Sequence, residues 1–183
     1  MQIVDWIMKK MIPMKKYPEY LKKRGVNIGE GCEIYKSVNF GSEPYLVTLG
    51  ENVRVAANVT FVTHDGGIWV LRHNLKYKER FKEADKFGRI IVGNNVHIGI
   101  NAVIMPGVHI GDNSIIACNA VVTHNVVAGS VVGGVPARVI ESIEDYSKKI
   151  ENSIVNTKLM SAEEKRKFLL SLRKDIDSGI RNE

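Results

Sequence analysis

The stretch from Val92 to Val139 reads VGNNVH IGINAV IMPGVH IGDNSI IACNAV VTHNVV AGSVVG GVPARV, which is eight consecutive units of six residues. The first place of these units holds, in order, Val92, Ile98, Ile104, Ile110, Ile116, Val122 and Ala128, and the pattern then fails at Gly134. The second place is usually small, as at Gly93 and Gly99. A period of six is neither the period of a helix nor that of a simple strand, so the repeat itself must be the structural unit.

The same period occurs earlier, from Ile28 and again from Leu49, with two interruptions. The step from Phe40 to Leu49 is nine residues, and the step from Phe61 to Val92 is 31. A unit of six suits a short strand and a turn with one aliphatic side chain pointing inward, and three units would close a triangular coil. Successive coils would stack through parallel hydrogen bonds at ~4.8 Å. Gly, Asn and Asp after the aliphatic place suit corners that need unusual backbone angles. A β-sandwich would instead have turns every ~8–12 residues, so the repeat predicts an all-β solenoid, a parallel β-helix.

The charge is unevenly distributed along the chain. The formal net charge is +6. From Met1 to Arg24 there are seven Lys or Arg against two acids, whereas from Ile90 to Ile140 only Asp112 and Arg138 are charged. A stretch that neutral must be covered by the chain itself or by copies of it. No nucleic-acid-binding motif is present and the aromatic residues do not interleave with the basic ones, so we expect no nucleic-acid partner.

The cysteines and the apolar segments indicate where in the cell the protein is expected. Two cysteines without a secretory core at the N-terminus predict a reduced, cytoplasmic protein. No run of 18 apolar residues exists, so no segment is expected to span a membrane. Ile3, Trp6, Ile7 and Met11 can form the apolar stripe of a short helix before Pro13. That helix would either pack on its own protein or rest on a membrane surface.

Three segments and one excursion are expected: an N-terminal helical segment at 1–25, the β-helix domain at 26–140, an excursion from it at 66–89, and a helical tail at 141–183. The excursion carries seven Lys or Arg against three acids and enough apolar side chains to dock. A long insertion that leaves a rigid scaffold is usually functional or disordered.

Two helix starts are expected in the tail, because Ser142–Asp145 and Ser161–Glu164 both match a capping box. Leu169, Leu172 and Ile176 then recur at helical spacing. The tail could cover the open end of the coil, which would otherwise expose strand edges, or it could take part in assembly.

The run IGINAVIMPGVHIGDNSIIACNAVVTHNVVAGSVVGGVPARVI, which ends at Ile140, resembles the hexapeptide-repeat acyltransferases. It is most similar to the branch that O-acetylates capsule and lipopolysaccharide sugars, with the maltose, galactoside and xenobiotic acetyltransferases as relatives. The resemblance covers about Val26 to Ile140. It implies a left-handed coil, a homotrimer with sites between subunits, acetyl-CoA as the acyl donor and a saccharide acceptor.

His64 is the expected general base. Transfer of an acetyl group from a thioester to a hydroxyl requires that the hydroxyl lose its proton as it attacks, and a neutral imidazole can take that proton, contributing roughly 10²–10⁴-fold. Of the five histidines, only His64 lies where the regular repeat meets the excursion, and its THDG motif matches the catalytic histidine of the family. Asp65 could orient the imidazole or hold the sugar, although neighbouring strand residues point to opposite faces.

Other site residues follow from the resemblance. Trp69 in the excursion and His97, where many relatives have Trp, are expected on the acceptor side with Asp65. The remaining four are expected along the coenzyme: Gly99, Ala117, Thr123 and Arg138. Gly99 and Ala117 would let the pantetheine arm approach closely, although a crowded corner would also demand small residues. Arg138 is one of two charges in the neutral stretch, which makes a phosphate contact plausible.

Three alternatives stay open. The same base and donor would serve an N-acetyltransferase of an amino sugar, or an enzyme that acetylates an antibiotic. A β-helix can also be a scaffold without catalysis. A zinc enzyme would need three converging histidines. The candidates would be His64, His97 and His109, but neither of the two steps between them is a whole number of three-unit coils. We therefore expect no metal.

Overall fold

The computed structural model describes residues 11–172. Its strands form three sheets, and the pairs within them are parallel apart from one hairpin, β12–β13. In spatial order, the first sheet contains β1 (Asn27–Ile28), β3 (Val47–Leu49), β6 (Ile90–Val92) and β9 (His109–Ile110). The second contains β13 (Ala137–Ser142), β12 (Ser130–Gly134), β10 (Ile115–Ile116), β7 (His97–Ile98), β4 (Arg54–Val55) and β2 (Glu33–Ile34). The third contains β11 (Val121–Val122), β8 (Val103–Ile104) and β5 (Thr60–Phe61).

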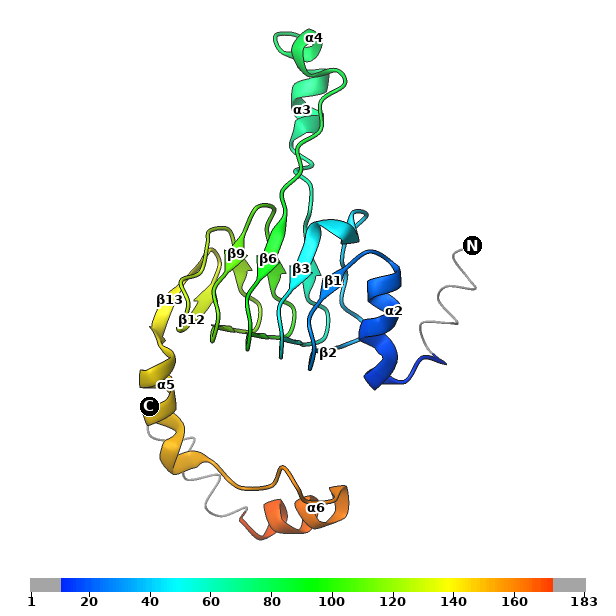
Figure 1. The fold of residues 1–183 in the computed structure, drawn as a ribbon. Helices are drawn as coiled ribbons and strands as arrows, with labels where there is room; N and C mark the ends of the chain where they lie inside the picture. The colour runs from blue at the N-terminus through cyan, green and yellow to red at the C-terminus, as the bar shows by residue number, and fades with distance from the viewer. Residues whose placement is uncertain (1–10, 173–183) are drawn as a thin grey trace. The chain divides into compact units, whose positions relative to one another are not determined.

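The chain visits the three sheets in turn, and one passage through all three forms a coil (Figure 1). Ile98 pairs with Ile116, so this coil contains the three six-residue units that the repeat predicted. Ile34 pairs with Val55, so the coil between them contains the short interruption. Val55 pairs with Ile98, so the next coil contains the whole of the long interruption. Both predicted interruptions are therefore confirmed in place.

The aliphatic first places of the repeat form the core. Those from Val92 to Val122 are each at most 1% exposed. The corners are turned by asparagines with positive φ between 53° and 60°: Asn52, Asn58, Asn95, Asn101, Asn113 and Asn119. Asparagine tolerates this left-handed region better than most residues. Its amide also links coils, because Asn95 Nδ2 donates to Asn113 Oδ1 at 2.8 Å and Asn101 Nδ2 to Asn119 Oδ1 at 3.1 Å.

The end of the repeat differs from the prediction. Ala128 is exposed, and the inward place is taken by Val126, which bridges to Ile110 in the first sheet. The last unit, GVPARV, does not add a parallel strand, because β13 turns back antiparallel on β12. The polar and small residues AGS and GG interrupt the aliphatic spacing there, so the hairpin ends the stack of parallel coils before the predicted boundary at 140.

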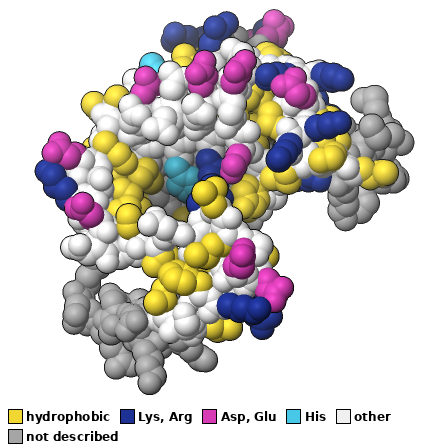
Figure 2. All heavy atoms as spheres, turned by 60° about the horizontal axis from the view of Figure 1, so that its bottom comes forward, with side chains coloured by type: hydrophobic (Ala, Val, Ile, Leu, Met, Phe, Trp, Pro, Cys, Tyr) yellow, Lys and Arg dark blue, Asp and Glu magenta, His cyan; other side chains and the backbone are white. Residues whose placement is uncertain are grey.

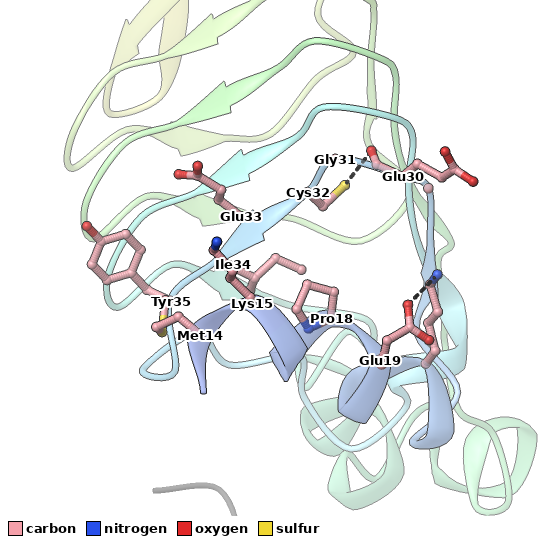
Figure 3. Close-up of a pocket in the computed structure, with 12 residues that line it drawn as sticks. Met14, Lys15, Pro18, Glu19, Glu30, Gly31, Cys32, Glu33, Ile34 and Tyr35 are labelled. Atoms are coloured by element: carbon pink, nitrogen blue, oxygen red, sulfur yellow. Dashed lines mark hydrogen bonds and ion pairs between the residues drawn. The ribbon is translucent and has the colours of Figure 1, made fainter. Parts of the chain in front are cut away.

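The N-terminal end is covered by a 3-10 turn, η1 (Met14–Lys16), and helix α2 (Tyr17–Lys23). Tyr17 and Leu21, one helical turn apart, are 1% and 4% exposed and belong to the same core cluster as the coil residues. A cleft of about 580 Å³ remains between these helices and β2 (Figure 3). Most of the predicted stripe, Ile3 to Ile7, lies outside the described residues.

A short turn, η2 (Pro44–Leu46), occupies the first interruption, and the second interruption forms a projecting excursion with helices α3 (Ile68–His73) and α4 (Lys78–Phe81) (Figure 1). Its two ends are joined as an antiparallel ribbon. Asp65 N donates to Lys86 O at 2.8 Å, Gly88 N donates to Thr63 O at 2.9 Å, and His64 faces Phe87 between them. The start of the excursion is therefore fixed to the coil.

Within the described residues, 145–172 form a separate compact unit. Helix α5 (Ile143–Ile150) begins directly after Ser142, and it is followed by η3 (Glu151–Ser153) and α6 (Ala162–Ser171). The capping box at Ser161 is confirmed, since Glu164 N donates to Ser161 Oγ and Ser161 N to Glu164 Oε2. Ile176 of the predicted stripe lies outside the described residues. Among residues 11–172, no helix has the length and apolar character needed to cross a membrane.

Candidate active site

His64 follows β5, at the corner where the chain would pass from the third sheet to the first. Its Nδ1 lies 3.1 Å from Oε2 of Glu43, and its side chain is 48% exposed against 15% for Glu43. A half-exposed ring held by a more enclosed carboxylate can meet a substrate without losing its orientation. The Nδ1 side of the imidazole is thus held by Glu43, while about half of the side chain remains accessible.

Glu43 was not predicted from the sequence. It lies in the short interruption between Phe40 and Leu49, at the equivalent corner of the preceding coil. The buried hydroxyl of Thr63 donates to the same Oε2 at 2.6 Å. Hydrogen bonds from Thr63, Ser42 and His64, in decreasing order of effect, lower the pKa of Glu43 to about 2. The carboxylate is therefore ionised at neutral pH.

The ionised carboxylate fixes the tautomer of His64. Because a carboxylate can only accept hydrogen bonds, Nδ1 must carry the proton in this contact. The lone pair of the neutral ring is then on Nε2, and it is available to accept a proton from a substrate. The negative charge of Glu43 also stabilises the imidazolium that forms after proton transfer. The arrangement is suited to general-base catalysis.

A cavity of about 330 Å³ adjoins His64 and the base of the excursion. Two aromatic side chains line it. Phe87 is 53% exposed and meets the His64 ring edge-on, with ring centroids 6.4 Å apart. Trp69 is 63% exposed and lies 4.4 Å from the ring of His73. Trp69 and His64 thus line the same cavity, whereas Phe87 was missed because its place opposite His64 depends on the ribbon at the base of the excursion.

Asp65 lines the same cavity but does not orient His64. Its Oδ1 accepts from Gly67 N at 2.9 Å, and its Oδ2 lies 3.1 Å from Lys86 Nζ. The hydrogen bond from Gly67 N is the main reason that the pKa of Asp65 lies below its usual value, and the contact with Lys86 is the second. Arg72 is similarly engaged with Ala84 O and Asp85. Glu43, and not Asp65, therefore contacts and orients the imidazole. Of the two roles considered for Asp65, only contact with the acceptor remains.

His97 does not line this cavity. It lies within β7 rather than at a corner, next to Arg54 of β4, and it faces a different hollow of about 330 Å³ on the second sheet. Burial, followed by the charge of Arg54, lowers its pKa. Within one chain, His97 and His64 therefore belong to separate surfaces.

Gly99 and Ala117 occupy successive levels of the corner between the second and third sheets. The structure gives a packing reason for their size. A Cβ on Gly99 would lie 2.6 Å from Cys118 N, and a Cβ on Gly133 would lie 3.0 Å from that of Ala117. Gly99 does not have a positive φ, so it is small because the next coil is close rather than because of its backbone angles.

Thr123 and Arg138 are exposed. Thr123 follows β11 at the same corner as His64, two coils further along, and its Oγ1 lies 2.8 Å from Nδ1 of His124. Arg138 is on β13, opposite Gly133, and its Nη1 donates to Ala137 O at 2.8 Å. Its exposed guanidinium has the chemistry to bind a phosphate. Within residues 11–172, no three His, Cys, Asp or Glu side chains are placed to hold a metal ion.

Known proteins are similar to this chain in sequence and in fold. Residues 89–124 match the family model of the bacterial transferase hexapeptide, six repeats. Protein CapG of Staphylococcus aureus is 40% identical over 158 residues, which cover 85% of this chain and 88% of CapG. The chain belongs to the hexapeptide-repeat acetyltransferase family. Within that family, galactoside O-acetyltransferase of Escherichia coli K12 is 38% identical over 139 residues, covering 71% of this chain and 64% of the relative.

The family assignment extends to structure. A galactoside acetyltransferase solved in complex with coenzyme A superposes with a TM-score of 0.57 at 31% identity, covering 75% of each chain. The match extends well beyond the repeat model at 89–124. As a member of this hexapeptide-repeat family, the protein is an acetyltransferase of the sugar O-acetyltransferase branch.

Proposed function

We propose that the protein transfers the acetyl group of acetyl-CoA to a saccharide hydroxyl, with His64 as the general base. The observation that carries this proposal is the contact between Nδ1 of His64 and ionised Glu43, which leaves Nε2 free beside a cavity. Bound acetyl-CoA supplies the thioester that the hydroxyl attacks. As the hydroxyl oxygen attacks the thioester carbonyl, His64 Nε2 takes its proton, and Glu43, held by Thr63, stabilises the imidazolium. The C–S bond then breaks, and the imidazolium returns the proton to the departing thiolate of coenzyme A.

The acceptor is proposed to bind in the cavity beside His64. Pyranose rings have an apolar face that stacks on aromatic side chains and hydroxyls that bond to carboxylates. The cavity offers both kinds of group, in Trp69, Phe87 and Asp65. This combination favours a saccharide over a purely apolar acceptor.

The complete site is proposed to lie between subunits of a homotrimer of left-handed coils. The predicted coenzyme residues support this. Gly99 and Ala117 are at one corner of the coil and His64 and Thr123 at another, separated by a whole side of about six residues, or ~20 Å. A second copy could bring the two sets together at a subunit boundary. Exposed apolar residues are available for that contact, including Ile100 (47%) and Val127 (75%). His97 would reach an acceptor only in the same way.

Arg138 fits the coenzyme in this arrangement, because its exposed guanidinium can bind a phosphate. The cytoplasmic location expected from the cysteines is compatible with acetyl-CoA as donor. An N-acetyltransferase acting on an amino sugar would use the same groups, and acceptor screening with labelled acetyl-CoA separates the two reactions.

The decisive experiment compares His64→Ala with His109→Ala, since His109 lies in β9 and is exposed away from the cavity. Acetyl transfer should fall by roughly 10²–10⁴-fold in the first variant only, with unchanged circular dichroism and unchanged mass by light scattering in both. Turnover near the wild-type level in His64→Ala would refute the proposed mechanism.

A further inference from the structure

The helical cover at the N-terminal end of the coil has a surface chemistry that the acetyl-transfer site does not use. Lys15, Lys16 and Lys23 are exposed, and Lys22 is exposed although it is paired with Glu19 at 2.8 Å. Figure 2 shows Lys and Arg side chains gathered at this end of the coil, with some acidic side chains among them. The positive charge lies on η1 and α2, whereas the acids Glu30 and Glu33 lie on the opposite wall of the cleft.

Apolar side chains accompany these lysines. Met11 is 76% exposed and Met14 is 45% exposed. Met14 and Pro18 form the helical wall of the 580 Å³ cleft, whose other wall includes Ile34 and Tyr35 (Figure 3). Lysines flanking exposed methionines differ from an ordinary solvated surface, on which large apolar side chains are scattered singly.

The preceding ten residues, MQIVDWIMKK, have the same composition. They add Lys9 and Lys10 against Asp5, together with Ile3, Trp6 and Ile7. The N-terminal segment up to Arg24 thus holds seven of the 26 Lys and Arg of the chain and one of its two tryptophans. Basic and apolar side chains in one short segment are characteristic of proteins that lie at a membrane interface.

We propose that this end of the protein, the surface formed by residues 11–24, docks on an anionic phospholipid membrane. The lysines on the helical side lie against lipid phosphates, and the exposed methionine side chains enter the headgroup region. Charge complementarity selects an anionic bilayer as the partner, because each Lys or Arg near such a surface strengthens binding by about 5-fold. In the proposed homotrimer, with coils along the threefold axis, three such ends would face the membrane together.

The test uses full-length protein and vesicles of phosphatidylcholine, alone or with phosphatidylglycerol. We expect sedimentation with the mixed vesicles at ~50 mM NaCl, release at ~500 mM NaCl, and no sedimentation with phosphatidylcholine alone. In a Trp69→Phe background, Trp6 is the only tryptophan, and its emission should shift to the blue on binding. Absence of binding to anionic vesicles would overturn the proposal.

A matched pair of triple variants locates the surface. Neutralising Lys15, Lys16 and Lys23 to Gln should weaken vesicle binding by roughly 10²-fold. Neutralising Lys76, Lys78 and Lys82, which are equally exposed on the excursion, makes the same change in net charge and should alter binding less than ~3-fold. Equal losses in both variants, or a loss only in the second, would show that another surface binds. Because the assay contains no acyl donor, its outcome is independent of the proposed reaction.

Discussion

Replacing Gly99 with Ala tests whether this corner is small for the coenzyme or for the next coil. The new Cβ would lie 2.6 Å from Cys118 N and 2.9 Å from Ile116 O. Ordinary contacts begin at 3.4 Å, so the two coils would have to separate by ~0.8 Å of their ~4.8 Å spacing. That movement would also lengthen the bond from Gly99 N to Ile116 O, now 2.8 Å, beyond a useful distance.

The loss in free energy of unfolding can be estimated from these changes. Overpacking typically costs ~1–3 kcal/mol, and a lost hydrogen bond ~0.5–1.5 kcal/mol. Against this, Ala restricts the unfolded chain and returns ~0.4–1 kcal/mol. The net destabilisation is therefore ~0.5–4 kcal/mol, which lowers the melting temperature of a chain of this length by ~1–16 °C.

The assay is thermal unfolding by circular dichroism at equal protein concentration, with the Michaelis constant for acetyl-CoA measured below the transition. Gly66→Ala is the control, because a Cβ at Gly66 meets nothing within 4 Å, and its melting temperature should stay close to that of the wild type. A Gly99→Ala protein that melts like the wild type but binds acetyl-CoA poorly would refute the packing argument and restore the coenzyme interpretation.

Four further predictions concern the site residues and the excursion. Glu43→Gln keeps the shape but removes the charge that stabilises the imidazolium, so turnover should fall on the order of 10²-fold in steady-state assays, and an unchanged turnover would remove Glu43 from the mechanism. Because folding lowers the pKa of Glu43 from 4.5 to about 2, its contribution to stability should be complete above pH 4.5 and lost as the pH falls towards 2; chemical denaturation across this range should therefore show a smaller loss in Glu43→Gln than in the wild type. Phe87→Ala should raise the Michaelis constant of the acceptor several-fold and leave that of acetyl-CoA unchanged, with Phe87→Tyr restoring binding; equal effects on both constants would argue against an acceptor contact. Replacing residues 64–89 by one glycine removes the long interruption and restores the six-residue step from Phe61 to the next unit, so this variant should keep its β-sheet circular dichroism and lose acetyl transfer, whereas unfolding would show that the excursion supports the coil.

The sequence was sufficient for the architecture because one period governs most of it. Each aliphatic first place from Val92 to Val122 is buried as expected, and the length of an uninterrupted coil follows from three units. The prediction failed where the period changes locally. The shortened step from Val122 to Val126 and the hairpin at β13 are determined by contacts at the end of the stack, which a repeat pattern does not contain.

The candidate site was predictable in part for the same reason. His64 and Trp69 could be found because a long interruption of the repeat marks them. Phe87 could not, because its place opposite His64 depends on the pairing of two segments that lie at opposite ends of the excursion. The size of Gly99 was ambiguous in the sequence, since a coenzyme and a neighbouring coil demand the same small residue, and only the distance to Cys118 distinguishes them.

Glu43 shows how much more a repeat can reveal when its irregularities are compared with one another. The short interruption that holds Glu43 and the long one that begins at His64 both fall at the corner between the third and first sheets, in consecutive coils. Coils stack at ~4.8 Å, so residues that bulge from the same corner of neighbouring coils must meet. The two departures from the period therefore bring the acid and the base together, and Glu43 can be found only when both are considered. In a chain whose regular positions are occupied by packing, reactive side chains are best sought where two interruptions share a corner.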